Sequence, residues 1–302
     1  MPSRRTVRSA RRFARKVSPD RAIAFQGAPG AYSDMACRAA FPGMTTLPCA
    51  TFEDAFLAVQ SNRARLGMIP VDNSVAGRVA DVHHLMPHSG LHIIGEHFES
   101  VNHHLLAPRG ATLKTIRTVM SHIHALPQCR KLIRALKLKP VVYPDTAGAA
   151  AEVARRGDPT VAAIASELAG QIYGLVSLRK NIEDAEHNTT RFLVLSRQAK
   201  LPRPGSGPVM TTFVFRVRSV PAALYKALGG FATNGVNLTK LESYMVGGHF
   251  EAAQFYVDAE GHPNDRPMQL ALEELKFFSR ELNILGVYPQ SPFRRANAAA
   301  DD

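Results

Sequence analysis

Short apolar runs alternate with helix-like segments through the first two thirds of the chain. Each run ends in polar or turn-forming residues, and strands are predicted at 22–25, 66–71, 141–143 and 161–164. Between them, the spacing of apolar residues predicts helices at about 33–40, 55–59, 74–86, 126–136 and 147–156. Strands that alternate with helices are typical of parallel sheets, so an α/β fold is expected for this part.

The pattern changes after a linker at 201–208, which is dense in proline and glycine. Beyond it, strands are predicted at 210–217, 236–246, 250–258 and 282–287, with helices at 221–233 and 268–278 and a turn at Gly247-Gly248. The order βαββαβ is the ferredoxin-like arrangement. A larger α/β portion and a small α+β domain are therefore expected.

The composition is that of an ordinary globular protein, since 45% of the 302 residues are hydrophobic and 21% are charged. No apolar run approaches the ~20 residues of a membrane helix, so no membrane segment is expected. Cys37, Cys49 and Cys129 are odd in number and lack metal-ligand spacing. They favour free thiols and a cytoplasmic location.

The net charge of +12 is concentrated at the N-terminus. Seven of the excess positive charges lie within residues 1–17, which contain no acidic residue. Residues 1–20 are predicted to be a basic disordered tail, with a transit peptide or a start codon placed too far upstream as alternatives. The rest of the chain keeps a modest positive excess that suits a small anionic molecule. Nucleic-acid binding is not expected, because its support is almost wholly in the tail.

A polar cluster, Asn188-Thr189-Thr190-Arg191, opens directly into the apolar run 192–195. The run is predicted to be a buried strand, so these side chains stand at the end of a rigid element. Polar residues also occur at four strand-to-helix junctions: Tyr32-Ser33, Asn73-Ser74, Ser121-His122 and Asp145-Thr146. One such junction is usually only a helix cap, but five polar ends in one domain favour a cleft for a small anion.

No cofactor is expected. Gly27-x-x-Gly30 lacks the third glycine and the acidic residue of a dinucleotide fingerprint, and it is too short for a phosphate loop. His84 and His88 have helical spacing, but no third ligand is evident, so the histidines between 83 and 97 are expected mostly at the surface. Ser121 and His122 are sequence neighbours that point apart on a strand, which argues against a catalytic triad built on them.

The order of these motifs resembles the prephenate dehydratase family over about 22–288. The resemblance rests on the segments 25–33 (Phe-Gln-Gly-Ala-Pro-Gly-Ala-Tyr-Ser), 69–74 (Ile-Pro-Val-Asp-Asn-Ser), 121–129, 163–166, 181–184 and 188–192. The last segment is similar to the family's Thr-Arg-Phe motif. The resemblance implies a lyase that converts prephenate to phenylpyruvate, water and carbon dioxide in L-phenylalanine biosynthesis, without a metal or a nucleotide.

The resemblance also implies the site residues. Thr190, Arg191 and Phe192 are the expected catalytic residues, with Thr190 as the hydrogen-bond donor to the leaving hydroxyl. Arg191 is expected either to bind the pyruvyl carboxylate of the substrate or to hold the site together, since on a strand it points away from Thr190. The expected substrate-binding residues are Ser33, Asn73, Ser74, Ser121, Gln128, Thr146 and Asn188.

The implied catalytic domain, 21–200, has two α/β lobes like a type II periplasmic binding protein, with the site between them. The first lobe is expected at about 21–111 with 190–197, and the second at 112–189. The C-terminal unit, 209–289, resembles the regulatory ACT domain of the family, and 290–302 is expected to be a tail. This domain implies L-phenylalanine as an effector and a homodimer or homotetramer.

The expected effector-binding residues are Ala223, Leu224, Asn234, Gly235, Val236, Asn237, Leu238, Glu242 and Ser243. Ala222 stands where the family usually has glycine, and Tyr244-Met245 stands where it has Arg-Pro. These departures leave a dimerisation module without a ligand as the alternative for this domain. For the whole chain, arogenate dehydratase and a non-catalytic amino-acid-binding sensor are the alternatives.

Overall fold

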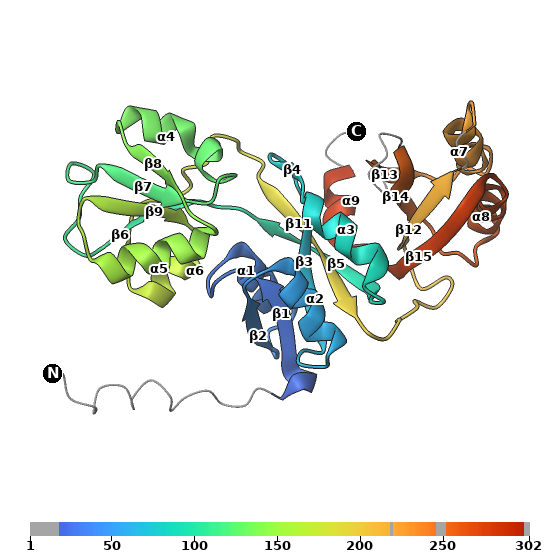
Figure 1. Ribbon diagram of the computed structural model, residues 1–302, viewed down its shortest axis with the longest axis horizontal. Helices are drawn as coiled ribbons and strands as arrows, with labels where there is room; N and C mark the ends of the chain where they lie inside the picture. Colours follow the sequence, from blue (N-terminus) through green and yellow to red (C-terminus); the bar gives the residue numbers. More distant parts are fainter. Residues whose placement is uncertain (1–17, 218–219, 246–251, 299–302) are drawn as a thin grey trace.

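The computed structural model of the chain describes residues 18–217, 220–245 and 252–298. Figure 1 shows three parts in a row: a second lobe in green, a first lobe mainly in blue, and a C-terminal unit in orange and red. The predicted two-lobed α/β fold followed by a βαββαβ unit is confirmed.

The first lobe is a sheet of order β5-β11-β3-β1-β2 in which β1 is parallel to β2 and β3. Strand β11 is antiparallel to both β3 and β5, because the chain returns to this lobe after passing through the second one. The elements of the first lobe are η1 (Pro19–Arg21), β1 (Ala22–Gln26), α1 (Tyr32–Ala40), β2 (Thr45–Cys49), α2 (Phe52–Gln60), β3 (Leu66–Asn73), β4 (Gly77–Arg78), α3 (Ala80–Leu85), η2 (Met86–His88), β5 (His92–Ser100) and β11 (Thr189–Ser196).

The second lobe is a sheet of order β10-β6-β9-β7-β8. Its elements are β6 (His104–Ala107), β7 (Thr118–Ser121), η3 (Leu126–Cys129), α4 (Arg130–Ala135), β8 (Lys139–Val142), α5 (Thr146–Arg156), β9 (Val161–Ala165), α6 (Glu167–Tyr173) and β10 (Val176–Arg179). The family resemblance places the crossing between the lobes near 112, whereas the chain has crossed by His104. The reason is that β6 is buried along its length between β9 and β10.

The loop between β1 and α1 joins the two lobes. Gly30 has a φ of +89°, and a Cβ at this position would lie 2.7 Å from the Cα of Ala169 on α6. Ser166 Oγ donates a hydrogen bond to the Gly30 carbonyl at 2.5 Å, and the Tyr173 hydroxyl donates to the Pro29 carbonyl at 2.9 Å. The glycine is therefore required by a left-handed backbone and by close packing between the lobes.

The C-terminal unit is a sheet of order β13-β14-β12-β15. Its elements are β12 (Val209–Val217), α7 (Ala223–Thr233), β13 (Leu238–Met245), β14 (Ala252–Glu260), α8 (Arg266–Phe278) and β15 (Ser279–Pro289). Apolar side chains of α7 and α8 pack with those of the strands in one cluster. The turn predicted at Gly247-Gly248 lies outside the described residues.

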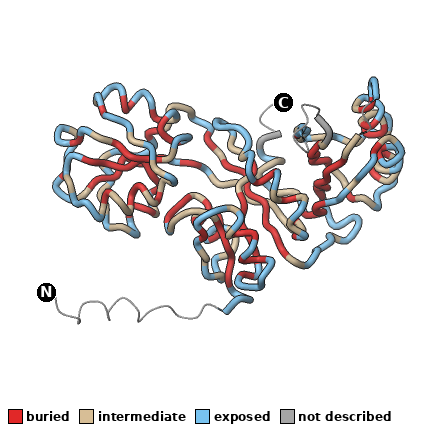
Figure 2. The backbone as a smooth tube through the Cα atoms, in the orientation of Figure 1, coloured by how far each residue is buried: buried red, intermediate tan, exposed pale blue. Residues whose placement is uncertain are grey.

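The C-terminal unit continues the first sheet. Strand β15 pairs with β5 at Gly286 and Ile93, which makes a ten-stranded sheet. A Cβ on residue 286 would clash with the carbonyl of Ile93, so this approach requires glycine. Apolar side chains from both parts, among them Met86, Met210 and Tyr288, form one buried cluster. Figure 2 shows the buried strands at the centre of each part and the exposed segments around them.

The segment expected to be a tail contains a helix, α9 (Pro292–Ala298). It packs on β5, where the ring of Phe293 stacks on Phe98 with centroids 4.5 Å apart. Arg294 donates to the two carboxylate oxygens of Glu96 at 2.8 and 3.0 Å. Glu96 lies 198 positions earlier in the chain, so the local sequence carries no sign of this contact.

His83 on α3 is buried against the C-terminal unit, although the sequence pattern places it at the surface. Its ring centroid lies 5.4 Å from that of Tyr244 and 4.9 Å from that of Tyr256. Neither imidazole nitrogen has a hydrogen-bond partner within the described residues. Burial lowers the pKa of His83 to about 4, and the charge of Lys240 adds to this effect, so the ring is neutral at neutral pH.

We expect the protein to become less stable as the pH falls from about 6.5 to about 4. In this window the unfolded chain binds a proton at His83 and the folded chain does not, so the free energy of unfolding decreases by up to about 3 kcal/mol. Urea unfolding at several pH values measures the decrease. His83→Leu should remove most of this pH dependence, and a variant that keeps the full wild-type slope would assign it to another group.

Candidate active site

A cleft of about 820 Å³ lies between the two lobes. It is lined by the ends of β1 and β3, the first turns of α1 and α5, the start of β11 and the segment after β7. The site residues expected from the sequence that line it are Ser33, Asn73, Gln128, Thr146, Thr190 and Phe192. Polar ends of elements that are far apart in the sequence therefore meet at one place.

Two expected substrate-binding serines are not among the cleft-lining residues and instead hold elements together. Ser74 Oγ donates to the carbonyl of His187 at 2.9 Å and accepts from the backbone N–H of Thr189 at 2.9 Å. Ser121 is fully buried, and its Oγ donates to the carbonyl of Ile164 at 2.6 Å. The structure does not bring either hydroxyl to the cleft lining.

Asn73 fixes the direction of the Thr190 hydroxyl. Its Oδ1 accepts the backbone N–H groups of Val75 and Ala76 at 3.0 and 2.7 Å, which turns Nδ2 toward β11. Nδ2 then donates to Thr190 Oγ1 at 3.0 Å and to Asn188 Oδ1 at 2.8 Å. Because the amide N–H occupies an acceptor position of Oγ1, the hydroxyl proton of Thr190 is available to a ligand in the cleft.

The hydrogen-bond chain continues into the second lobe. Asn188 Nδ2 donates to Gln128 Oε1 at 2.7 Å, and His103 Nε2 donates to the same oxygen at 2.8 Å. Asn188 is thereby used as a link between lobes and does not itself line the cleft. The Tyr32 hydroxyl lies 2.9 Å from His103 Nδ1. Burial lowers the pKa of His103, so the imidazole is neutral.

The first turn of α1 adds backbone donors to the cleft. This helix begins without a side-chain cap, and Tyr32 and Ser33 at its start line the cleft. Uncapped N–H groups and the positive end of the helix dipole suit a carboxylate ligand.

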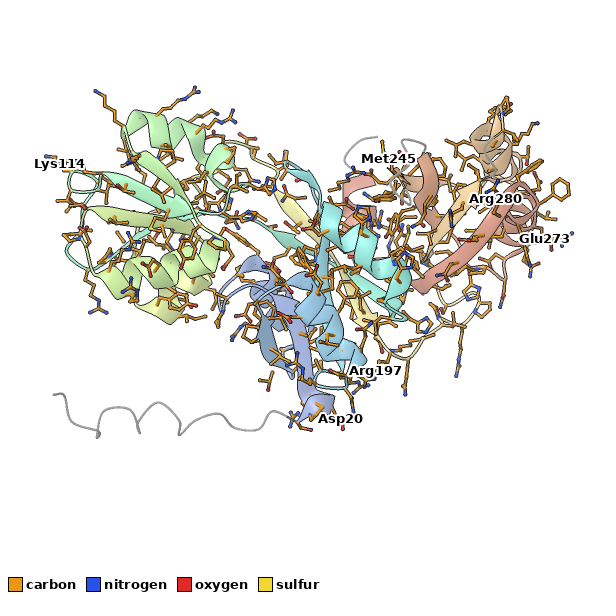
Figure 3. The ribbon with its side chains drawn as sticks, in the orientation of Figure 1. Asp20, Lys114, Arg197, Met245, Glu273 and Arg280 are labelled. Atoms are coloured by element: carbon orange, nitrogen blue, oxygen red, sulfur yellow. The ribbon has the colours of Figure 1, made fainter. Side chains whose placement is uncertain are left out.

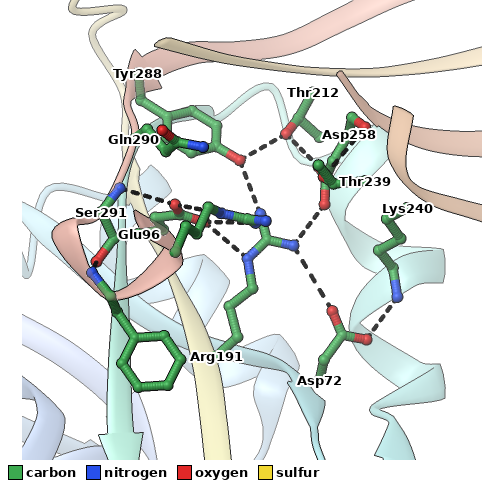
Figure 4. A network of polar contacts seen from close by, with 12 residues as sticks. Asp72, Glu96, Arg191, Thr212, Thr239, Lys240, Asp258, Tyr288, Gln290 and Ser291 are labelled. Carbon is green, nitrogen blue, oxygen red and sulfur yellow. Dashed lines mark hydrogen bonds and ion pairs between the residues drawn. The ribbon is translucent and has the colours of Figure 1, made fainter. Parts of the chain in front are cut away.

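Arg191 lies on the other face of β11, away from the cleft. Its Nε donates to Glu96 at 2.9 Å, Nη1 to Asp258 at 2.5 Å and Nη2 to the Tyr288 hydroxyl at 3.0 Å. Figure 4 shows this network, in which Asp72 also approaches Nη1 at 3.7 Å. The side chain does not line the cleft, so the geometry favours the second of its two expected roles, holding the site together, and its partners show that it does so by joining the first lobe to the C-terminal unit.

Arg191 and Asp258 are both charged at neutral pH. Burial alone would lower the pKa of Arg191, but the charge of Asp258 and the other neighbours raise that pKa well above its usual value. Burial alone would raise the pKa of Asp258, but the charge and hydrogen bonds of Arg191 and a hydrogen bond from Thr212 lower it. Arg191 and Asp258 therefore form a buried ion pair, and both groups also make hydrogen bonds to other side chains.

His103 and Arg78 are two of the cleft-lining residues that were not expected from the sequence as site residues. His103 stands in an apolar context that indicates only a half-buried strand residue, and its partners come from other elements. Arg78 lies in the two-residue strand β4, which has no periodic pattern of its own. Neither position carries a local signal that distinguishes it from an ordinary surface or core residue.

The described residues contain no group of three or more histidine, cysteine or acidic residues placed to hold a metal ion. Burial raises the pKa of the thiols of Cys37, Cys49 and Cys129. These thiols are therefore protonated and unreactive at neutral pH.

Comparison with known proteins identifies the family. The family model for prephenate dehydratase matches residues 23–200. A protein of Komagataeibacter europaeus, named bifunctional N-acyl-homoserine lactone acylase/prephenate dehydratase, is 56% identical over 280 residues, which cover 92% of this chain and 99% of the relative. This chain belongs to the prephenate dehydratase family. A further relative, the chloroplastic arogenate dehydratase/prephenate dehydratase 1 of Arabidopsis thaliana, is 39% identical over 286 residues, covering 90% of this chain and 73% of the relative.

Solved structures extend the likeness to the whole described chain. A structure named GqqA, a novel type of quorum quenching acylase, matches with a TM-score of 0.85 and 56% identity, covering 91% of this chain and 100% of that chain. Prephenate dehydratase of Arthrobacter aurescens in complex with L-Phe matches with a TM-score of 0.81 and 29% identity, covering 93% and 98%. Both matches cover more than nine tenths of this chain, so they include the C-terminal unit. This unit is hereafter called the ACT domain.

Proposed function

We propose that the cleft eliminates water and carbon dioxide from prephenate, with Thr190 as the donor to the leaving hydroxyl. The observation that carries the proposal is the hydrogen bond from Asn73 Nδ2 to Thr190 Oγ1 at 3.0 Å. It directs the threonine proton away from Asn73, and Thr190 lies in the cleft lining. Prephenate dehydratases are lyases of phenylalanine biosynthesis, and this chain belongs to that family.

The reaction requires that prephenate is held in a fixed pose and that its leaving hydroxyl receives a hydrogen bond. The bond from the ring to its carboxylate breaks, and its electron pair enters the ring as carbon dioxide departs. The hydroxyl leaves the opposite ring carbon with its bonding pair and takes up a proton from solvent to become water. A threonine hydroxyl is a poor general acid, so Thr190 acts as a preorganised hydrogen-bond donor to the developing charge. Because Arg191 is outside the cleft, it does not pair with the carboxylate that must be lost.

A side-by-side substrate assay tests this function. The purified chain is expected to convert prephenate to phenylpyruvate, detected by ultraviolet absorbance, with a higher kcat/KM than for arogenate. Turnover of arogenate alone would instead make the chain an arogenate dehydratase. Turnover of neither substrate would refute the proposed elimination.

We also propose that L-phenylalanine binds between the ACT domains of two copies of the chain and thereby regulates the enzyme. The expected effector-binding residues fall into three groups: Ala223 and Leu224 begin α7, 234–238 follow its other end, and Glu242 and Ser243 lie within β13. A helix of 11 residues spans about 16 Å, so one amino acid does not reach both of its ends in one chain. β13 is an outer strand with Met245 exposed (Figure 3), and free sheet edges pair readily.

Ala222 shows why glycine is usual before this helix. Its φ is +61°, in the left-handed region that alanine adopts only at a cost. The chain keeps this left-handed turn before α7 with alanine in place of glycine. This supports the proposal that α7 begins in the geometry that effector binding requires.

Isothermal titration of the full chain with L-phenylalanine tests the regulatory proposal. We expect binding with one ligand per chain and a lower rate of prephenate turnover in its presence. Sedimentation of the same samples should show a dimer or a tetramer. No heat at millimolar phenylalanine would show that the ACT domain serves only for association.

A second candidate function is hydrolysis of N-acyl-homoserine lactones, because a relative that is 56% identical over 99% of its length carries that activity in its name. In the described cleft lining, no serine, threonine or cysteine hydrogen bonds to a histidine, so the lining holds no preformed nucleophile–base pair of this kind. Release of homoserine lactone from an acylated substrate tests it. Absence of hydrolysis beside normal prephenate turnover would exclude this activity.

We propose a cytoplasmic location for the enzyme. The three cysteines are buried and unpaired, which suits a reducing compartment. Among the described residues, no helix has the length and apolar character needed to cross a membrane. Cell fractionation with detection of the protein tests the location.

A further inference from the structure

One side chain dominates the positive charge of the cleft. Arg78 is the only arginine or lysine among the described residues that line it. His103, His122 and His124 also line the cleft. Burial lowers the pKa of the His103 and His122 imidazoles, so these two supply no positive charge at neutral pH. Prephenate carries two carboxylates, and charge-assisted hydrogen bonds to a guanidinium are among the strongest contacts available to a carboxylate.

Backbone pairing anchors Arg78 beside the strand that orients Thr190. β4 pairs with β3 so that Arg78 lies opposite Asp72 and Gly77 lies opposite Asn73. The backbone of Arg78 is therefore fixed next to the Gly77–Asn73 pair, and the side-chain amide of Asn73 donates a hydrogen bond to the Thr190 hydroxyl. The side chain itself is 43% exposed, so its direction depends on the groups around it.

Those groups belong to the ACT domain. Arg78 Nη1 donates to Glu242 Oε2 at 3.0 Å, and the guanidinium carbon lies 5.5 Å from the centroid of the Tyr244 ring. Both partners are on β13. Within the described chain the guanidinium makes this one side-chain hydrogen bond, so its other N–H donors have no side-chain partner, and Arg78 also belongs to the cleft lining.

We propose that Arg78 binds the pyruvyl carboxylate of prephenate and that Glu242 and Tyr244 of the ACT domain hold it in position. The inference rests on the proposed function, because it takes prephenate as the substrate. The pyruvyl carboxylate is the suitable partner because the product retains it. A tight ion pair with the ring carboxylate would oppose its loss as carbon dioxide.

The same contacts give an effector a direct route to the cleft. Glu242 also accepts a hydrogen bond from Lys240 at 3.3 Å, and Lys240 donates to Asp72 at 2.6 Å. A ligand that engages Glu242, or a shift of β13, therefore leaves Arg78 without its positioning partners. Inhibition by this route weakens substrate binding, so it raises KM more than it lowers kcat.

Steady-state kinetics of Arg78 variants on prephenate test the binding role. Arg78→Gln is expected to raise KM by about 10- to 100-fold with kcat within about threefold. Arg78→Lys should recover part of the loss, since it keeps the charge but not the planar fork. Arg216→Gln is the matched control, because it breaks the Arg216–Glu281 pair elsewhere on the ACT domain and should keep the wild-type KM. A wild-type KM in Arg78→Gln would overturn the proposal.

A double-mutant cycle tests the positioning role of Glu242. Glu242→Gln is expected to raise KM by about 3- to 10-fold when Arg78 is present and to have no further effect in Arg78→Gln. Independent, multiplicative effects would overturn the link between the two residues. Turnover by the wild-type protein is measured first. If it does not convert prephenate, the proposed function is refuted. If it converts prephenate but the Arg78 variants keep the wild-type KM, only the role of Arg78 is refuted.

Discussion

Thr190→Val is expected to lower kcat for prephenate by about 100- to 1,000-fold and to leave KM within about threefold. Valine has nearly the same shape but no hydroxyl, so the leaving group loses its donor. Asn73 Nδ2 keeps its hydrogen bond to Asn188 Oδ1 at 2.8 Å, which holds the cleft wall in place. Initial rates of phenylpyruvate formation over a range of prephenate concentrations separate kcat from KM.

Thr190→Ser is the matched control for this prediction. Serine keeps the hydroxyl and can accept the same Asn73 N–H, so most of the wild-type kcat should remain. The unfolding midpoints of both variants should stay near that of the wild type, since each change is confined to one side chain at the cleft. A wild-type kcat in Thr190→Val would assign the donor role to another group.

Arg191→Met is expected to reduce the free energy of unfolding by about 3–5 kcal/mol. The carboxylates of Glu96 and Asp258 are fully buried, and Arg191 bonds to them at 2.9 and 2.5 Å. Without the guanidinium, Asp258 becomes an uncompensated buried charge, while Glu96 keeps Arg294 as its one cationic partner among the described residues. Urea unfolding followed by circular dichroism measures the loss.

Two further variants distinguish the buried cluster from a general effect of losing an arginine. Arg216→Gln removes a more exposed ion pair within the ACT domain and should leave stability almost unchanged. Combining Asp258→Asn with Arg191→Met removes the stranded charge and should recover part of the lost stability. An Arg191→Met protein as stable as the wild type would show that this cluster does not hold the ACT domain on the first lobe.

Many of the elements and the order of the domains could be predicted because their signals are local, whereas β2, β5, α6 and β10 were not predicted. The apolar run 192–195 and the polar residues before it indicate a strand with chemistry at its end, and β11 has that form. Alternation along a strand also indicates that Arg191 faces away from Thr190, as observed. The βαββαβ order follows from the spacing of apolar residues beyond the linker.

The remaining features depend on partners far away in the sequence. His83 is buried because the ACT domain covers α3, and its own helix gives no sign of that contact. The helix α9 exists in a segment expected to be a tail because Glu96 and Phe98 bind it. Ser121 has the residue type of a ligand-binding group, but its hydroxyl is used by the backbone of a neighbouring strand. Local patterns do not determine these choices.

The two faces of the strand pair β3 and β11 have separate functions. On β3 and β11, Asn73 and Thr190 face the cleft. The next residues along, Asp72 and Arg191, face the ACT domain and bond to Lys240 and Asp258. The residues at the cleft and the residues that attach the ACT domain are thus neighbours in the sequence, but their side chains lie on opposite faces of the sheet.

The most direct test of this separation measures kcat for prephenate and the free energy of unfolding for Thr190→Val and Arg191→Met side by side. Opposite results are expected: Thr190→Val loses kcat and keeps its stability, whereas Arg191→Met loses stability and, under conditions where it is folded, keeps most of its kcat. A folded Arg191→Met protein that lost kcat as completely as Thr190→Val would place Arg191 in the chemistry and contradict the account.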